Sequence, residues 1–456
     1  MKRCVSSVLL FVALAASAAL TNAQQAARTL TLRDAIQLAL KRNIDVQVSA
    51  TEVSEAEGAR TRSLAALLPH ASGDAVANLV KNNLSIEGIS FPGLPTTVGP
   101  FAYYDFRVFG SQAIVDRQAF HAWKASVRQE DAAKLSYQDT RNLVVRETAR
   151  RYLQSETAQA EVEAAQSRVQ TSQVLESLAS DQHAQGLATA IDVVRSQVQL
   201  ARDQQALLVA ENNYQTSLLA LARFLGLSPG TSIELAEKLQ FRHVEVPDVE
   251  QALPAALAVR EDYRALLNQQ ESLIEQQKAS HARYLPVFSV SGNYGAAGRN
   301  FGTMPFNGGI EGVLSISIFD RDRSGEREQI ESRAARLKAQ IDDLSRGIEQ
   351  DLRKAMLDIR SADQQVRVTE AALDLAQREL TLAEDRFRNG VSDNIEVITA
   401  QAALTAAQDD HIAAVAQHGD AYAALARALG ATERNYQTYL DEIAPPSGTD
   451  GQKGLK

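Results

Sequence analysis

The chain carries an internal duplication. Residues 186–226 align with residues 390–430 at a shift of 204 positions without a gap, and about a third of the paired residues are identical. The same shift pairs Asp116 with Asp320, so the two halves keep one spacing over more than a hundred residues. A repeat of this length indicates a fold built from two copies of one structural unit.

Both halves have the same order of predicted elements: a helix, two strands, a very long helix, a glycine turn and a second helix. Each opening helix ends at a Leu-Pro step, because proline and the residue before it leave the helical region. Gly186 and Gly390 mark the turns. The predicted spans of the first helix, the two strands and the long helix are 32–68, about 70–80, about 102–115 and 118–183 in one half, and 249–285, about 287–296, about 309–319 and 322–387 in the other.

The first residues are typical of a secretory signal peptide. Lys2 and Arg3 precede a short apolar run at 8–20, and Thr21-Asn22-Ala23 forms a small-residue cleavage site. The run is too short to span a bilayer, although an N-terminal membrane anchor is the alternative. The predicted organisation is a signal peptide at 1–23, a first repeat at 24–226, a linker or equatorial segment at 227–248, a second repeat at 249–430, and a C-terminal equatorial segment with a flexible tail at 431–456.

The long helices carry coiled-coil spacing. A helix of 66 residues would be roughly 100 Å long at 1.5 Å per residue, which suits a duct across a wide compartment better than a globular core. Large residues alternate with small ones along a seam, which lets two helices approach closely. A fibrous or scaffold coiled coil is the alternative that this pattern leaves open. The large residues are Leu352, Ile359, Val366, Leu373, Leu380 and Phe387.

The predicted strands alternate between apolar and polar residues. Tyr104, Phe106 and Val108 oppose Asp105 and Arg107 in the first half. This period places one face against apolar surroundings and the other against water, and about ten residues is the length of a transmembrane strand. A soluble sheet packed on helices is the alternative. In the second half Phe288, Val290 and Tyr294 oppose Ser289, Ser291 and Asn293, and Ile310, Leu314, Ile316 and Ile318 oppose Glu311, Ser315 and Ser317.

Four strands per chain cannot close a barrel. An open strand edge in lipid leaves backbone groups unpaired at several kcal/mol each, so strands that span a membrane require the chain to oligomerise. The segment 81–100 is expected to be the longer extracellular loop between the first two strands.

Several function classes are excluded by composition and motifs. The formal net charge of −9 argues against nucleic acid as a partner, because such binding calls for a basic patch. No later stretch has 18 consecutive apolar residues, so no transmembrane helix is expected. His411 and His418 are seven residues apart on a predicted helix, too far to share a metal ion. No catalytic constellation, metal site or cofactor motif is found, and the chain is not expected to be an enzyme.

Three segments resemble the TolC-like outer-membrane efflux protein family, and the similarity extends over essentially the whole mature chain. They are Leu30–Leu40, the turn Gly186–Val193 with its repeat Gly390–Val397, and Ala222–Gly226. The resemblance implies a mainly α fold of long coiled-coil helices in an α-barrel, with four strands per chain in a trimeric 12-strand membrane β-barrel. It also implies a homotrimer in the outer membrane of a Gram-negative-type bacterium, with a periplasmic extension. The implied partners are outer-membrane lipid, a periplasmic adaptor (membrane fusion) protein and an inner-membrane RND or ABC transporter.

The resemblance also suggests a site at the periplasmic entrance. Members of the family narrow this entrance with acidic side chains, and Glu396 matches one such position. Thr399 stands where a second acid is expected, Phe387 where a gating tyrosine can occur, and Asp192 matches an acidic partner in the first repeat. Three copies of Glu396 around a narrow axis would create a negative field that favours cations. The alternative is a solvated residue on a helix face.

The two turns are the predicted adaptor-contact tips. They are also compatible with ordinary helix-ending turns, and the two interpretations can hold together. Ser392 occupies a position where an arginine can pair in the family. The tip residues are Gly186, Leu187, Ala188 and Thr189 in the first repeat, and Gly390, Val391, Ser392 and Asp393 in the second.

The predicted function is an outer-membrane channel subunit of a tripartite efflux system. It would be a passive exit duct for small toxic compounds that an inner-membrane pump delivers through the adaptor. One alternative is the exit channel of a type I protein secretion system. A diffusion porin would carry many more strands per chain, and a non-transport periplasmic coiled-coil scaffold would need no alternating strands.

Overall fold

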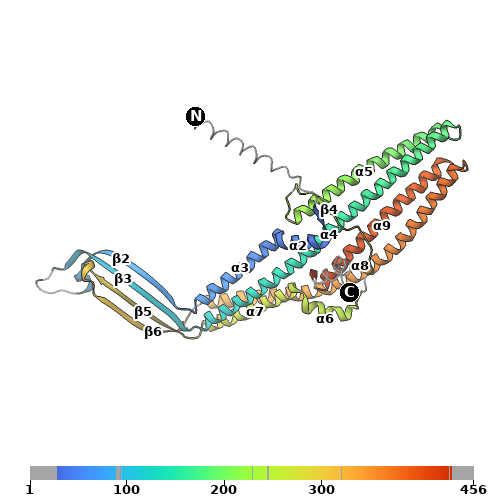
Figure 1. Cartoon of the computed structure of the whole chain (residues 1–456). Coiled ribbons are helices and arrows are strands. Elements are labelled where there is room, and N and C mark those ends of the chain that lie inside the picture. Colours follow the sequence, from blue (N-terminus) through green and yellow to red (C-terminus); the bar gives the residue numbers. More distant parts are fainter. Residues whose placement is uncertain are drawn as a thin grey trace, which may run out of the picture. The chain divides into compact units, whose positions relative to one another are not determined.

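The computed structural model describes residues 28–88, 93, 95–228, 230–243, 246–319, 321–430 and 432–433 (Figure 1). The predicted signal peptide and C-terminal tail lie outside these residues. The chain divides into two compact units, and several helices contribute to both. The first unit comprises 1–48, 139–260 and 347–456, and the second comprises 49–138 and 261–346.

The second unit contains an antiparallel sheet of four strands in the order β2-β3-β5-β6 (Figure 1). Its strands come in pairs from the two halves of the duplication, as predicted. The short helices η1 (Leu84–Glu87) and η2 (Phe301–Thr303) follow β2 and β5. The strands are β2 (His70–Asn83), β3 (Thr97–Val115), β5 (Val287–Gly298) and β6 (Phe306–Ser315).

The strand register sorts the sheet into an apolar and a polar face, as the alternation predicts. Phe106 pairs with Ala296, and Phe288 pairs with Leu314, so the apolar residues of three strands share one face. On the opposite face Arg107 donates hydrogen bonds to the side-chain oxygens of Asn293 at 2.6 Å and Asn307 at 3.0 Å. The apolar face has exposed large side chains, namely Phe106, Val108, Phe288, Tyr294, Phe306, Ile310 and Leu314.

Two predictions about the strands need correction. β6 begins at Phe306 and ends at Ser315, so Ile316 and Ile318 lie beyond the strand and do not continue its alternating face. The predicted loop at 81–100 is shorter, because β2 extends to Asn83 and β3 begins at Thr97. In both cases the paired residues lie closer to the loop that joins the two strands than the side-chain pattern predicts. This holds for the β2–β3 loop and for the β5–β6 loop.

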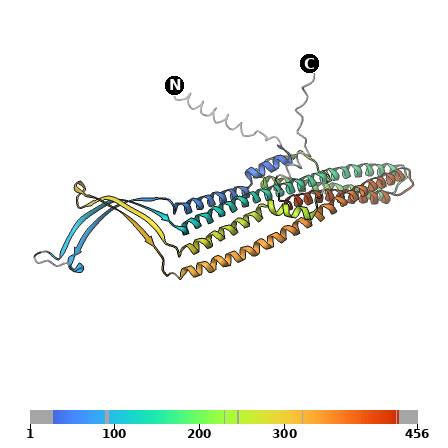
Figure 2. The same ribbon diagram turned by 90° about the horizontal axis from the view of Figure 1, so that it is seen from below.

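The helices of the second unit pack around the start of α4 (Arg117–Ala184). Arg60 of α3 (Ile44–Ala65) pairs with Glu130 of α4 at 3.0 Å. On the other side of α4, Ser272 of α7 (Glu261–Ala282) donates to the main-chain oxygen of Ala125 at 2.9 Å. α7 in turn contacts α8 (Asp322–Arg388), because the Ser280 hydroxyl donates to the Glu326 carboxylate at 3.4 Å. The helices therefore form a layer in the order α3-α4-α7-α8 (Figure 2).

The first unit continues α4 and α8 and adds α5 (Ala190–Phe224) and α9 (Asn394–Ala428). Figure 1 shows α4 beside α5 and α8 beside α9, each pair joined by a tight turn. Ile359 of α8 packs with Leu425 of α9, and Val145 of α4 packs with Ala423 of α9. The predicted heptad seam is confirmed in its packing, since Leu352, Ile359, Val366, Leu380 and Phe387 are all buried.

A short parallel pair of strands and two further helices complete the first unit. β1 (Arg28–Leu30) pairs with β4 (Ile233–Leu235), which lies in the predicted equatorial segment. The helices are α2 (Leu32–Arg42) and α6 (Val249–Val259). Across the described parts of the chain, no helix has both the length and the apolar character that membrane crossing would need.

The prediction of one continuous opening helix in each half is wrong. The first is interrupted at Asn43, whose side chain accepts the Asp45 N–H at 2.8 Å and donates to the Phe224 carbonyl at 3.0 Å. The second is interrupted at Arg260, the buried C-cap of α6. The helices also end at Ala65 and Ala282, before the Leu-Pro steps.

The Leu-Gly ends of the second helices pack on these interruptions. Gly226 has φ +68°, and a Cβ built on it would lie 2.8 Å from the main-chain oxygen of Arg42. Gly430 has φ +79°, and its Cβ would lie 2.6 Å from Cγ of Arg260. Only glycine combines this backbone conformation with so close an approach. The repeated Leu-Gly pair therefore closes each half on its own broken helix.

Candidate functional site

The two helix turns of the first unit have the same geometry. Gly186 (φ +78°) ends α4, and the N–H of Leu187 donates to the carbonyl of Gln182 at 2.8 Å. Gly390 (φ +67°) ends α8, and the N–H of Val391 donates to the carbonyl of Arg386 at 2.9 Å. Glycine is favoured here because the left-handed conformation satisfies the last carbonyls of a helix.

The predicted adaptor-contact residues lie on the surface of these turns. Leu187 is 72% exposed and Val391 is 67% exposed, which is unusual for two aliphatic side chains at equivalent places. Ala188 and Ser392 are half-buried, and the other predicted tip residues, Gly186, Thr189, Gly390 and Asp393, are exposed. Each turn therefore presents one apolar side chain at its tip. The contact of these tips with an adaptor protein stays a prediction.

Asp192 is buried and fixes the start of α5. Its Oδ2 accepts hydrogen bonds from the N–H of Thr189 at 3.0 Å and from the hydroxyl of Thr189 at 2.6 Å. Arg195 lies 3.6 Å from its other carboxylate oxygen. This arrangement is a capping box, which satisfies donors that the first turn of a helix leaves free. The Asp192 side chain is thus engaged within its own turn.

Two side-chain amides join the turns of the two repeats. Asn394, 1% exposed, donates to the main-chain oxygen of Asp192 at 3.0 Å. Gln182, also buried, donates to the main-chain oxygen of Phe387 at 3.2 Å. Sequence reasoning missed both residues. Asn394 stands where the first repeat has Ala190. This difference between the repeats is the sequence feature that could have identified Asn394.

Phe387 is buried beneath the turns. It is 4% exposed and packs in an apolar cluster formed by three helices. Its side chain therefore belongs to the core of the helix ends in this structure, whereas the sequence placed it at the entrance itself. The cluster consists of Leu175, Ala179, Ala376, Leu380, Ala383, Phe387, Val397, Ala400 and Leu404.

Glu396 is half-exposed and has a basic partner. Its carboxylate lies 3.2 Å from Nε of Arg386, the residue that also caps the end of α8 through its carbonyl. A surface pair of this kind contributes little to stability, but it reduces the net charge at the position by one. Sequence reasoning missed Arg386, although its place four residues before Gly390 was visible.

Thr399 lies beside a basic groove. Its hydroxyl donates to the Ile395 carbonyl at 2.8 Å, and the residue lines a cavity of about 440 Å³ between α5 and α9. Arg195 and Arg202 also line this cavity, next to the apolar side chains of Val194, Val198, Ile395 and Ile398. Thr399 therefore lies beside two arginines, one of which also pairs with Asp192.

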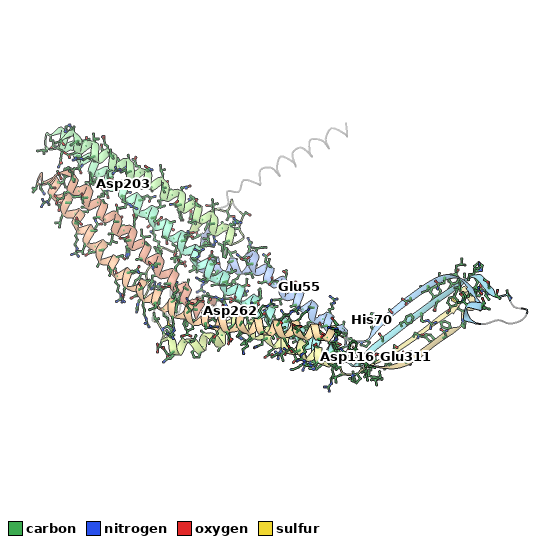
Figure 3. The ribbon with its side chains drawn as sticks, turned by 180° about the vertical axis from the view of Figure 1, so that it is seen from behind. Glu55, His70, Asp116, Asp203, Asp262 and Glu311 are labelled. Atoms are coloured by element: carbon green, nitrogen blue, oxygen red, sulfur yellow. The ribbon has the colours of Figure 1, made fainter. Side chains whose placement is uncertain are left out.

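A buried carboxylate joins three helices further along the first unit. Asp203, labelled on α5 in Figure 3, accepts hydrogen bonds from Ser172 of α4 and from the amide of Gln199. The amide of Gln401 on α9 donates to the hydroxyl of Ser172 at 2.7 Å. These hydrogen bonds offset the free-energy cost of burying a carboxylate between tightly packed helices. Gln401 has an equivalent in the first repeat, Gln197, which lies on the surface instead.

The described residues offer no group of three or more acidic, histidine or cysteine side chains that could hold a metal ion. The candidate site is therefore a pair of tied helix turns with charged and apolar groups around them. It can bind another protein surface or line a passage for solutes.

Comparison with known proteins agrees with this architecture. The family model described as "Outer membrane efflux protein" matches residues 35–227 and 252–431. The chain is 23% identical to the pyoverdine export outer membrane protein OpmQ of Pseudomonas aeruginosa, over 87% of this chain and 84% of that protein. The OpmQ of Pseudomonas putida is also 23% identical, and that match covers 67% of this chain and 66% of the relative.

A second relative and a solved structure point the same way. The probable efflux pump outer membrane protein TtgC of Pseudomonas putida is 25% identical, over 83% of this chain and 78% of TtgC. The fold matches the CmeC outer membrane channel of Campylobacter jejuni with a TM-score of 0.78 and 15% identity, over 89% of this chain and 88% of that one. The predicted family is thereby confirmed. This chain belongs to the outer membrane efflux protein family, whose members are outer-membrane channels with a periplasmic extension and not enzymes.

Proposed function

We propose that this chain is one subunit of a homotrimeric exit duct in a tripartite efflux system. The duct would carry small toxic compounds passively across the periplasm and the outer membrane. An inner-membrane pump would deliver them through a periplasmic adaptor that contacts the two helix turns. The names of the relatives, a pyoverdine export outer membrane protein and a probable efflux pump outer membrane protein, support export as the function.

The observation that carries the proposal is the four-stranded sheet of the second unit. One face is apolar and exposed, and the other carries polar groups around Arg107. Among the described residues, β2 and β6 each have a strand neighbour on one side only. Such a sheet is stable in lipid only when its outer strands pair with further strands, because unpaired backbone groups are costly there. Three copies would give 12 strands, with the polar face lining the passage.

The helices supply a second argument for a ring of identical chains. α5 exposes Ile191, Val194 and Val198 at steps of three and four residues, and Leu208 and Leu219 continue this stripe. α8 exposes Val368, Leu375 and Leu382 at steps of seven. Apolar stripes at such spacing are the seams of coiled coils. Because the stripes belong to different helices, contact between them is head-to-tail, and such a contact closes into a ring when the rotation from one chain to the next divides a full turn.

The first experiment measures the mass of the detergent-solubilised protein by light scattering, with the detergent contribution subtracted. The proposal expects a mass of three chains in the outer-membrane fraction. The variant Leu375→Glu places a charge in the α8 stripe and should dissociate the assembly. Gln377→Glu, which adds the same charge at an exposed residue outside the stripe, should leave it intact. A periplasmic monomer or dimer that is soluble without detergent would contradict the proposal and favour the scaffold.

Export itself is tested in a strain that lacks the chromosomal gene. The wild-type chain should restore tolerance to small toxic compounds, and Leu375→Glu should not. If trimers form but only the secretion of a protein is restored, the channel serves a protein secretion system instead.

A further inference from the structure

A cavity of about 530 Å³ lies in the first unit, away from the helix turns. Its walls are α4, α9 and the segment 236–242 that follows β4. This volume is within the range of sites for small organic molecules. Its polar lining includes Tyr152, Glu156, Glu237, His418 and Asp420.

Two of the three cationic side chains that line this cavity form ion pairs with acids outside it. Arg150 donates to both carboxylate oxygens of Glu147, at 2.8 and 2.9 Å. Lys238 donates to Glu163 at 2.9 Å. Glu147 and Glu163 do not line the cavity, whereas the third cation, Arg242, does. The carboxyl groups of the lining thus face a space in which two of the three neighbouring positive charges are paired with other acids.

Two polar groups in the wall lack a matching partner. His418 is 4% exposed, and its Nε2 has no hydrogen-bond partner among the residues that the structure describes. Phe241 lies edge-on to the imidazole at 4.8 Å and holds the ring in place. Glu156 is half-buried, and burial, together with the like charge of Glu237, raises the pKa of its carboxyl. A buried polar atom without a partner is costly, and a bound molecule that supplies donors removes that cost.

The remaining wall is apolar. Leu32, Leu153, Leu239 and Tyr422 line the cavity together with Ala149 and Ala423. Gly419 keeps this wall close to α4, because a Cβ there would lie 2.6 Å from Cδ2 of Leu153. The site therefore combines acceptors on one side with an apolar surface large enough for a ring or a short alkyl chain.

We propose that this cavity binds a small organic cation, an amidinium or ammonium group carried on an aromatic or aliphatic body. The N–H donors meet the carboxylates of Glu156 and Glu237 and the free Nε2 of His418. The body lies against Leu153 and Tyr422. None of the lining residues belongs to the helix turns, and binding here neither requires nor excludes the function proposed above.

Proton release accompanies binding in this arrangement. Burial, and secondarily the nearby Glu237, raise the pKa of the Glu156 carboxyl to about 8. A cation needs the ionised carboxylate, so its affinity rises with pH while Glu156 titrates, by about tenfold between pH 7 and pH 9. The other charged or titratable groups that line the cavity are Tyr152 and Arg150 on α4, Glu237, Lys238 and Arg242 on the segment, and His418 and Asp420 on α9.

The test is isothermal titration calorimetry of the full-length protein in detergent, with benzamidine as the probe and neutral benzamide as its matched control. Benzamidine stays charged at pH 9, so the expected result is one saturable site per chain, with binding about tenfold tighter at pH 9 than at pH 7. Benzamide should not bind. Glu156→Gln should weaken benzamidine binding at pH 9 at least tenfold and abolish its pH dependence.

Two further variants keep the test decisive. Ala236→Trp fills the cavity from an exposed position on the segment and should prevent binding without altering a carboxylate. Glu161→Gln makes the same change as Glu156→Gln on the same helix, outside the cavity, and should bind benzamidine like the wild type. Absence of saturable binding by the folded wild type at pH 9 would overturn the proposal. So would equal binding by Glu156→Gln and Glu161→Gln.

Discussion

The side-chain amide of Asn394 donates a hydrogen bond to the main-chain oxygen of Asp192, 202 residues earlier in the chain, at 3.0 Å. Both residues are buried at the first turns of equivalent helices, α9 and α5. The bond therefore joins the two repeats at the point where each helix pair turns. Together with the bond from Gln182 to the Phe387 carbonyl, it holds the two turns in one arrangement.

Removing this amide should loosen the turns. Asn394→Ala removes one donor from the buried Asp192 carbonyl, which still accepts the Ser196 hydroxyl at 3.1 Å, so the loss should be about 0.5–1.5 kcal/mol. We expect faster amide hydrogen exchange in residues 186–194 and 390–397, with exchange elsewhere unchanged. Asn389→Ala is the matched control, because the Asn389 amide donates only within its own helix, to Asp385 at 2.7 Å. Equal exchange in the two variants would show that the bond does not hold the turns together.

The pair formed by Glu396 and Arg386 should set the ion selectivity of the entrance. Their side chains are 42% and 56% exposed and lie 3.2 Å apart, so each partly neutralises the other. Glu396→Gln should lower the preference for cations in planar bilayers. Arg386→Gln should raise it, because in the proposed trimer it leaves three unpaired carboxylates around the axis. The opposite signs are the internal control. Unchanged selectivity in both variants would remove this pair from the conduction path.

The periodic features of the fold could be predicted from the sequence. Heptad spacing and strand alternation recur many times along the chain, and the duplication extends over more than a hundred residues. Each of these features is therefore supported by many residues. The face assignment of Phe106 and Arg107 is an example, because a period of two fixes which side of a sheet each residue occupies. The long helices were predicted to within one residue at each end for the same reason.

Single-residue events were not predictable in this way. Asn43 interrupts a helix because its side chain finds a partner at Phe224, which is far away in sequence. Helical periodicity continues on both sides of the interruption and conceals it. The same holds for the site, since the surroundings of Glu396 and Phe387 are set by packing between helices. The sequence shows the charge or apolar character of these side chains, but it does not show which group each of them contacts.

The two helix-end glycines Gly186 and Gly226 should contribute differently to the stability of the fold. Gly186 and Gly226 both have positive φ, but a Cβ on Gly186 meets open space whereas one on Gly226 meets the Arg42 carbonyl at 2.8 Å. Gly186→Ala should therefore lose only the conformational cost, about 1–2 kcal/mol. Gly226→Ala should lose that and about 1–3 kcal/mol more from forced displacement of backbone. Thermal melting followed by helical circular dichroism measures both, and equal melting temperatures would contradict the packing role of Gly226.

The stability of the first unit should depend on pH through Glu156. The folded pKa of this carboxyl is about 8, above the ordinary value of 4.5, so the folded chain holds a proton that the unfolded chain has lost between these values. Its contribution therefore makes the folded state less stable as pH rises from 4.5 to 8. Glu156→Gln cannot lose a proton and should flatten this part of the curve. Its melting temperature should exceed that of the wild type at pH 8 and approach it at pH 4.5. Thermal melting in one detergent across this pH range tests the sign of the effect. If the melting temperatures of the wild type and the variant change with pH in parallel, Glu156 is solvated like a surface carboxylate.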